Sequence, residues 1–257
     1  MGRFDRQTVL ITGAAGGFGS AAARRFAAEG ARLVLSDIHA ERLDAFAKTL
    51  DAETATLAGD IADEALSGDL VKLAADRFGR LDVAVNNAGI VHDAARLPQT
   101  PSDVARKVIE VDLLGVFYAL KHQLPQMERQ FRETGRGGQI VNIASVAGIA
   151  GAPKLAVYAA AKHGVVGFTR SAAAEYATRG VRVNAVCPSF ARTEMALAAL
   201  RGAPDQPAAE AEMTRGVPMK RLAEADEIVE VILFAADPKN SFMTGQALAA
   251  DGGITAI

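Results

Sequence analysis

The stretch Thr12-Gly13-Ala14-Ala15-Gly16-Gly17-Phe18-Gly19 follows an apolar run, Thr8–Ile11, and opens a segment with helical periodicity. Glycine lets a backbone turn tightly and approach a ligand closely. The N-terminus of a helix presents free N–H groups and a partial positive charge. A strand, a glycine turn and a helix in this order therefore predict a cradle for the pyrophosphate of a dinucleotide, formed by Gly13, Gly17, Phe18 and Gly19.

Short apolar runs alternate with amphipathic segments along the rest of the chain. The expected strands are Thr8–Ile11, Arg32–Ser36, Thr54–Ala58, Val83–Asn86, Gln139–Ala144, Arg182–Val186 and Gln246–Ala249. The expected helices are Gly17–Glu29, Ala40–Leu50, Glu64–Phe78, Pro101–Arg132, Val157–Thr178 and Glu224–Ala236. Several strands are apolar at nearly every position, as in parallel strands that helices cover on both faces. The pattern predicts an α/β fold, Rossmann-like and doubly wound, with about seven parallel strands.

Composition narrows the class of protein. The formal net charge of −2 gives no reason to expect nucleic acid or an anionic membrane as a partner. The single cysteine, Cys187, excludes an internal disulfide and fits a reducing compartment. The charged start, Met1–Gln7, lacks the pattern of a signal peptide, and no apolar run reaches the roughly 18 residues of a membrane span. We therefore expect a cytoplasmic protein.

No interior linker, repeat or charge run divides the chain, so we expect residues 1–257 to form one dinucleotide-binding domain. One segment, Phe190–Met219, departs from the alternation of strands and helices and contains three prolines. An irregular segment of this length is usually a functional lid or a disordered insertion. A substrate lid is favoured by its apolar side chains, which are Met195, Leu197, Leu200 and Met213.

Asp37 follows the second expected strand and lies 18 residues beyond Gly19. A carboxylate at this place can accept hydrogen bonds from both ribose hydroxyls of NAD, and it repels the 2′-phosphate of NADP. No arginine or lysine in the glycine stretch or at positions 38–41 offsets that repulsion. The sequence therefore favours NAD as the cofactor. The alternative is that Asp37 only caps the next helix.

Polar residues also follow the third and fourth expected strands. Ligands of such sheets gather at the carboxyl ends of the strands. We therefore expect these residues to line the path of the cofactor: Asp60, Ile61, Asn87, Ala88 and Gly89. Because Asp, Asn and Gly are also common turn residues, a purely structural role stays open for them.

Tyr158 and Lys162 are four residues apart, so on a helix they share one face. An unperturbed tyrosine has a pKa of about 10, too high for efficient proton transfer near neutrality, and a neighbouring ammonium group stabilises the phenolate. Ser145 ends the fifth expected strand, where its hydroxyl could bind a substrate oxygen. The Tyr-to-Lys spacing alone is common in helices, but here it accompanies a glycine cradle and Ser145.

These motifs together resemble the short-chain dehydrogenase/reductase family, and the resemblance covers nearly the whole chain. It rests on Thr12–Gly19, Asp37, Gly59-Asp60-Ile61, Asn86–Gly89, Ser145, Tyr158–Lys162, Val181–Asn184, Pro188 with Thr193, and Asp251-Gly252-Gly253. The resemblance implies Tyr158 as general acid/base and Ser145 as its partner on the substrate oxygen. It also implies that Lys162 stabilises the Tyr158 phenolate and holds the nicotinamide ribose. Pro188 and Thr193 are expected at the nicotinamide, with Thr193 on its carboxamide.

The chain departs from the pattern of this family at two places. The family usually places Asn in the fourth helix, where it supports a water in a proton relay, and this sequence has Asp112. Asp112 lacks the amide donor and can add a charge. We therefore count it among the catalytic candidates, and whether it supports the proton relay stays open. Ser189 stands where the family commonly has Gly after Pro. Cys187 is interpreted as a small buried hydrophobe, and the four histidines show no metal-ligand spacing.

The resemblance implies an NAD(H)-dependent enzyme that interconverts a secondary alcohol and a ketone. The apolar lid favours an uncharged substrate of small to medium size, and the C-terminal residues resemble members that act on cyclic diols or hydroxysteroids. Two alternatives remain. One is a 3-oxoacyl-[acyl-carrier-protein] reductase, against which Asp37 argues, and the other is a dinucleotide-sensing protein without turnover. The resemblance also implies a homotetramer formed through the expected helices Val104–Met127 and Val157–Tyr176.

Overall fold

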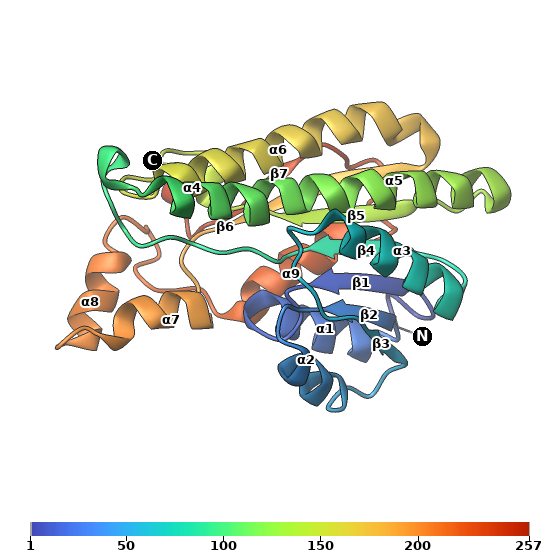
Figure 1. Ribbon diagram of the computed structural model, residues 1–257, viewed down its shortest axis with the longest axis horizontal. Helices are drawn as coiled ribbons and strands as arrows, with labels where there is room; N and C mark the ends of the chain where they lie inside the picture. Colours follow the sequence, from blue (N-terminus) through green and yellow to red (C-terminus); the bar gives the residue numbers. More distant parts are fainter. Residues whose placement is uncertain (1, 257) are drawn as a thin grey trace.

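The computed structural model describes residues 2–256, and within them seven parallel strands form one sheet in the order β3-β2-β1-β4-β5-β6-β7. The strands are β1 (Thr8–Thr12), β2 (Arg32–Ser36), β3 (Thr54–Thr56), β4 (Val83–Asn86), β5 (Gly138–Ile143), β6 (Val181–Pro188) and β7 (Ala247–Ala250). The chain reverses its direction of travel across the sheet between β1 and β4, as in a doubly wound fold. The predicted fold class is confirmed (Figure 1).

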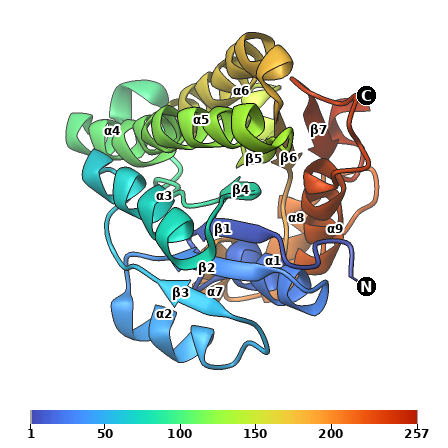
Figure 2. The ribbon, with the colours of Figure 1, turned by 90° about the vertical axis from the view of Figure 1, so that its right-hand side faces the viewer.

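Helices cover the sheet on both faces (Figure 2). On one face lie α1 (Gly17–Ala28), α2 (Ala40–Ala47) and α9 (Ala225–Ala236). The other face carries α3 (Glu64–Phe78), α5 (Gly115–Thr134) and α6 (Ala156–Tyr176). The remaining helices are α4 (Ser102–Ile109), α7 (Glu194–Arg201) and α8 (Gln206–Met213). Among the described helices, none combines the length and apolar character that crossing a membrane requires.

Two hydrophobic cores form because successive residues of a strand point to opposite faces of the sheet. In β1, Val9 and Ile11 belong to the core beneath α1 and α9, whereas Leu10 belongs to the core beneath α3, α5 and α6. All five residues of β1 are buried. This two-sided burial explains why the central strands are apolar at nearly every position.

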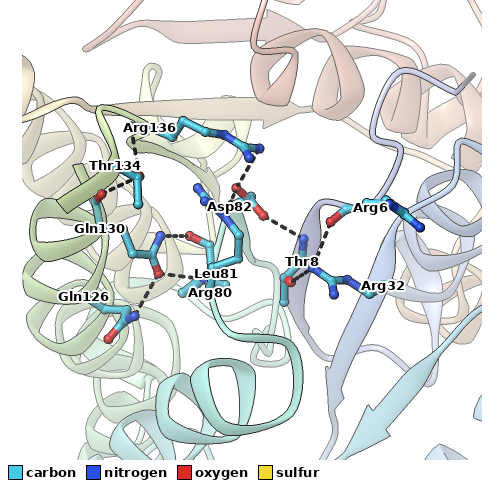
Figure 3. Close-up of polar contacts among 10 residues, drawn as sticks. All are labelled: Arg6, Thr8, Arg32, Arg80, Leu81, Asp82, Gln126, Gln130, Thr134 and Arg136. Atoms are coloured by element: carbon cyan, nitrogen blue, oxygen red, sulfur yellow. Dashed lines mark hydrogen bonds and ion pairs between the residues drawn. The ribbon is translucent and has the colours of Figure 1, made fainter. Parts of the chain in front are cut away.

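A buried polar network fixes the edge of the sheet where the strands begin (Figure 3). Asp82, just before β4, is 4% exposed; it accepts hydrogen bonds from Thr8 N at 2.9 Å and from Arg80 Nε at 2.6 Å. The side chain of Gln130 on α5 bonds both the N–H and the carbonyl oxygen of Leu81, each at 2.8 Å. The network therefore joins the start of β4 to β1 and to α5. It lies at the opposite edge from the glycine loop, which follows the carboxyl end of β1.

The expected helix Pro101–Arg132 is interrupted. A π-helical turn, η2 (Glu110–Leu114), separates α4 from α5 and contains Asp112. Such turns insert an extra residue into a helix and are frequent at functional sites.

The segment 190–219, which departs from the expected alternation, contains two short helices, α7 and α8, that the sequence analysis did not predict. Asp205 caps α8 by accepting a hydrogen bond from Ala208 N at 3.0 Å. Pro207 lies in the first turn of α8, where a helix does not need the missing N–H. The prolines that suggested a loop therefore mark the boundary between two short helices. Both helices lie to one side of the main body, below α4 in Figure 1.

Candidate active site

The glycine loop adopts a backbone conformation that favours glycine. Gly13 and Gly17 have φ angles of +63° and +49°, and a Cβ atom on Gly19 would lie 2.1 Å from the carbonyl oxygen of Gly13. Helix α1 starts at Gly17 with no side-chain cap and no acidic residue in its first turn. Its first N–H groups are therefore available to an anion, so the loop fits the pyrophosphate of a dinucleotide. The side chain of Phe18 packs against the core beneath α1.

Asp37 lies directly beside this loop. Its Oδ2 accepts a hydrogen bond from Ala15 N at 3.0 Å, and its Oδ1 accepts one from His39 N at 3.1 Å. The cap residue of α2 is His39, so Asp37 does not serve as the N-cap of that helix. The carboxylate is thus held at the end of β2, next to the first turn of the glycine loop.

The residues after β3 and β4 have mainly structural contacts. Asn87 Nδ2 donates to the carbonyl oxygens of Thr12 at 2.9 Å and Gly13 at 3.2 Å, and Ala88 N donates to Thr12 Oγ1 at 3.1 Å. These bonds fix the glycine loop to the end of β4. Asn87 therefore has the structural role that the sequence analysis left open. The cofactor role stays a prediction.

Asp60 and Ile61 lie on the next part of the same edge. Asp60 accepts hydrogen bonds from Ala62 N at 3.0 Å and from Lys107 Nζ at 2.9 Å, and these contacts lower the pKa of its carboxyl group. Ile61 contacts the start of α5, where a Cβ atom on Gly115 would lie 3.2 Å from it. Asp60 is thus an ionised acceptor whose partners already tie it to α4.

Ser145 lies two residues beyond β5 and begins the short turn η3 (Val146–Gly148). Its Oγ accepts a hydrogen bond from Ala147 N at 3.1 Å and lies 3.5 Å from the carbonyl oxygen of Pro188 at the end of β6. These contacts hold the hydroxyl at the carboxyl edge of the sheet. The turn after β5 and the end of β6 therefore position the hydroxyl.

Lys162 links four parts of the chain through its ammonium group. Its side chain is 5% exposed, and Nζ donates to the carbonyl oxygen of Ile143 at 3.1 Å. Nζ also lies 3.3 Å from Asp112 Oδ2 and 5.6 Å from the centre of the Tyr158 ring. A Cβ atom on Gly89 would lie 3.2 Å from Nζ, so the backbone after β4 passes directly over the ammonium group.

Asp112 is fully buried, and its carboxylate faces Lys162. Its Oδ1 accepts a hydrogen bond from Ile90 N at 2.8 Å, while Oδ2 has no hydrogen-bond partner within the described residues. Burial raises the pKa of Asp112, and the nearby ammonium group opposes this rise. Burial is the largest influence on the pKa of Lys162 and acts to lower it, but the neighbouring acidic groups, Asp112 first among them, together outweigh burial and raise that pKa. The pair is a buried ion pair with one oxygen left for a further donor.

The segment 190–219 contacts the glycine loop near its start and the Asp-Gly-Gly motif near its end. Thr193 is the cap residue of α7, and a Cβ atom on Gly17 would lie 3.8 Å from its side chain. At the other end, Cβ atoms on Gly252 and Gly253 would lie 2.7 Å from Val217 and 3.0 Å from Pro218. The closing Asp-Gly-Gly motif therefore seats the end of the lid against the sheet.

Cys187 lies in β6 beside this site but is fully buried. Burial raises the pKa of its thiol from 9.0 to about 11, so almost none of it is thiolate at neutral pH. The thiolate is the nucleophilic form of cysteine. The interpretation of Cys187 as a small buried hydrophobe agrees with this environment.

A cavity of about 630 Å³ lies within the lid itself, between α7 and α8. Its lining includes Arg192, Leu197, Leu200, Arg201 and Lys220. None of Ser145, Tyr158 and Lys162 lines it, so it is separate from the catalytic cluster. Leu200 is 6% exposed, which means that this apolar side chain is covered without any bound substrate.

Comparison with known proteins places this site in a family. A family model described as enoyl-(acyl carrier protein) reductase matches residues 13–255. The chain is 41% identical to cis-4-hydroxycyclohexanecarboxylate dehydrogenase of Sinomonas cyclohexanicum, over 99% of this chain and 98% of that protein. The chain belongs to the short-chain dehydrogenase/reductase family. The members of this family are oxidoreductases that use a nicotinamide dinucleotide.

Solved structures of family members have the same fold. The crystal structure of levodione reductase superimposes with a TM-score of 0.93 at 38% identity, covering 98% of this chain and 99% of that one. A structure of ElxO with NADP bound superimposes with a TM-score of 0.89 at 30% identity, again over 98% and 99% of the two chains. That relative thus binds a 2′-phosphorylated cofactor on the same fold.

The structure also places a charged pair at the site that the sequence did not indicate. Arg42 Nη2 lies 3.5 Å from the carbonyl oxygen of Ala15 and 3.0 Å from Glu194 Oε2. Positions 38–41 contain no basic residue, but α2 begins at Ala40, and its first turn brings Arg42 to the glycine loop. Arg42 therefore lies near the glycine loop although it is outside the stretch 38–41 that directly follows Asp37.

Proposed function

We propose that this protein is an NAD(H)-dependent oxidoreductase that interconverts a secondary alcohol and a ketone. The proposal is carried by the buried ammonium group of Lys162, held by Asp112 and Ile143 and next to the Tyr158 ring. A phenol beside a fixed ammonium group can exchange a proton with a substrate oxygen. The glycine loop at the same edge of the sheet fits the cofactor that the family uses.

In this reaction Tyr158 is the general acid/base. In the oxidation direction, its phenolate takes the hydroxyl proton of the alcohol, while the hydrogen on the carbinol carbon leaves as hydride. A bound nicotinamide supplies the hydride acceptor. Ser145 donates a hydrogen bond to the substrate oxygen, and Lys162 stabilises the phenolate and holds the nicotinamide ribose. Asp112 positions Lys162, and Pro188 and Thr193 line the nicotinamide side of the site.

The proposed substrate is a cyclic secondary alcohol of small to medium size. Support comes from the relative that is named for a hydroxycyclohexanecarboxylate and from the structural neighbour named for levodione. The sequence further favours an uncharged substrate because the lid is rich in apolar side chains. The first of these relatives is named for a carboxylate, so the charge of the substrate must be tested directly.

A panel of alcohols with NAD tests the proposed function. It should contain cyclohexanol, both isomers of 4-hydroxycyclohexanecarboxylate and 2,3-butanediol, with NADH formation as the measurement. The reverse assay should include a 3-oxoacyl thioester, because a 3-oxoacyl-[acyl-carrier-protein] reductase is the alternative enzyme that shares these motifs. Turnover confined to the thioester would favour the 3-oxoacyl alternative. Binding of NADH without turnover of any compound would favour the dinucleotide-sensing alternative.

The cofactor preference is a separate prediction. The protein should use NAD at least tenfold more efficiently than NADP in kcat/KM, a difference of about 1.4 kcal/mol. The physical reason is the carboxylate of Asp37, held beside the glycine loop by Ala15 N. Asp37→Ala should lower the ratio of kcat/KM for NAD to kcat/KM for NADP, because it removes the repulsion of the 2′-phosphate. Equal efficiency of the wild type with both cofactors would contradict this prediction.

We further propose a cytoplasmic homotetramer. Helices α5 and α6 lie side by side, and Phe117 of α5 is 41% exposed while stacking with Phe168 of α6 at 5.8 Å between ring centres (Figure 1). An aromatic surface of this kind can be covered by a second copy related by a two-fold axis. Light scattering at micromolar concentration should give about four times the chain mass. A mass near 26.8 kDa would refute the assembly.

Residues 1–257 are proposed to form one domain in which 190–219 is a substrate lid. Met195 and Leu197 of α7 are 45% and 36% exposed, so apolar surface remains for a bound substrate to cover. Closure would exclude water from the hydride transfer. Hydrogen exchange across 195–213 should be fast in the free protein and slow with NADH and a substrate analogue. Strong protection of this segment in the free protein would instead indicate a fixed wall.

A further inference from the structure

Two oppositely charged side chains contact the same residue of the glycine loop. Asp37 accepts a hydrogen bond from the N–H of Ala15 at 3.0 Å, and Arg42 lies 3.5 Å from the carbonyl oxygen of Ala15. Within residues 2–256, Arg42 is the one lysine or arginine whose side chain hydrogen-bonds to positions 13–19. A cation suited to a phosphate group is therefore present close to the carboxylate that repels one.

Arg42 is already paired with a residue of the lid. Its Nη2 donates to Glu194 Oε2 at 3.0 Å, and Glu194 is the first residue of α7. A Cβ atom on Gly16 would lie 3.5 Å from Nη2 and 3.8 Å from Oε2, so the pair lies directly over the glycine loop. Both side chains are about half exposed, which leaves them accessible to a ligand.

We propose that Glu194 is a specificity-determining residue that withholds Arg42 from the 2′-phosphate of NADP. Two carboxylates lie near Ala15, since Asp37 binds its N–H and Glu194 pairs with the arginine at its carbonyl oxygen, and they outnumber the single guanidinium group of Arg42. An arginine engaged by a carboxylate must give up that partner before it can bind a phosphate in bidentate fashion. Glu194 thus adds to the discrimination by Asp37 because it engages the one cation that hydrogen-bonds to the loop within residues 2–256. The inference rests on the proposed NAD-dependent function.

The effect should be modest, because an exposed ion pair contributes little and is screened by salt. Glu194→Gln should tighten the binding of 2′,5′-ADP relative to 5′-AMP by about fivefold at low ionic strength. The ratio should fall back toward the wild-type value at high salt. Arg42→Gln should lower the affinity for 2′,5′-ADP by less than twofold, because Glu194 already occupies the guanidinium group.

The test is a double-mutant cycle read by calorimetric titration with these two nucleotides. It needs neither a substrate nor turnover. In an Arg42→Gln background, Glu194→Gln should change the ratio of the two affinities by less than twofold, because the released cation is absent. Glu230→Gln is the matched control: Glu230 pairs with Arg25 on the surface between α9 and α1, and its loss should leave the ratio unchanged.

Two results would overturn the inference. One is an unchanged ratio in Glu194→Gln, and the other is an equal gain with and without Arg42, which would mean direct repulsion by Glu194. A failure of the proposed cofactor preference looks different. If the protein does not prefer NAD, the wild type itself would bind 2′,5′-ADP more tightly than 5′-AMP. The double-mutant cycle would still report whether Glu194 acts through Arg42.

Discussion

Tyr158→Phe is expected to lose more than nine-tenths of turnover, with a rate reduction of about 10²–10⁴. The substitution removes only the hydroxyl that exchanges a proton with the substrate oxygen. The ring that lies 5.6 Å from Lys162 Nζ stays in place, so the ammonium group keeps its surroundings. Affinity for NADH, measured by its fluorescence on binding, should change less than twofold.

Tyr118→Phe on α5 is the matched control for this experiment. It makes the same chemical change at a tyrosine outside the catalytic cluster and should keep nearly full turnover. A Tyr158→Phe variant that retains more than a tenth of the wild-type rate would show that another group handles the proton.

Lys162→Met should produce the largest loss of stability, about 3 kcal/mol. It leaves the carboxylate of Asp112 fully buried with only the hydrogen bond from Ile90 N. Urea unfolding at neutral pH measures the loss. Adding Asp112→Asn should recover about 2 kcal/mol, since the unpaired charge is then removed. Both variants should lose turnover and bind NADH more weakly, because Lys162 also serves the phenolate and the ribose.

The pH dependence of the single variant follows from Asp112. Burial raises the pKa of this carboxyl group in the folded protein above its usual 3.8. The folded state therefore binds a proton more readily than the unfolded chain, so stability is present at low pH and lost as pH rises through the folded value. Relative to the double variant, Lys162→Met should become more stable as pH falls from neutrality toward the usual carboxyl pKa of 3.8. The double variant should lack this gain, and a parallel pH response of the two would show that Asp112 is not the charged group responsible.

The central sheet was predictable because burial on both faces requires apolar residues at nearly every position of a strand. Each of β1, β2 and β4 is a short apolar run, and the structure places all three within about one residue of the expected ends. The glycine loop was predictable for a related reason. Positive φ angles at Gly13 and Gly17 and the close approach at Gly19 restrict all three positions to glycine.

The charged contacts of the site were harder to predict, because they join elements far apart in the chain. Asp112 was a candidate only through resemblance, and its partner Lys162 became evident from the fold. The contact of Arg42 with the glycine loop depends on the first turn of α2, and its partner Glu194 is 152 residues away, so no local pattern indicates either contact. The helices α7 and α8 were hidden by Gly202, Pro204 and Pro207, which delimit short helices as readily as they break long ones.

The most direct test of the account is the transfer of deuterium from a substrate alcohol to the cofactor. Cyclohexanol with deuterium on its carbinol carbon is mixed with NAD and the wild-type protein. The mass of the nucleotide product is then measured by mass spectrometry. If another alcohol in the panel is turned over faster, its deuterated form is used instead. We expect NADH that carries one deuterium and is formed together with an equal amount of ketone. Absence of deuterated NADH with every alcohol of the panel would contradict hydride transfer as the function of this protein.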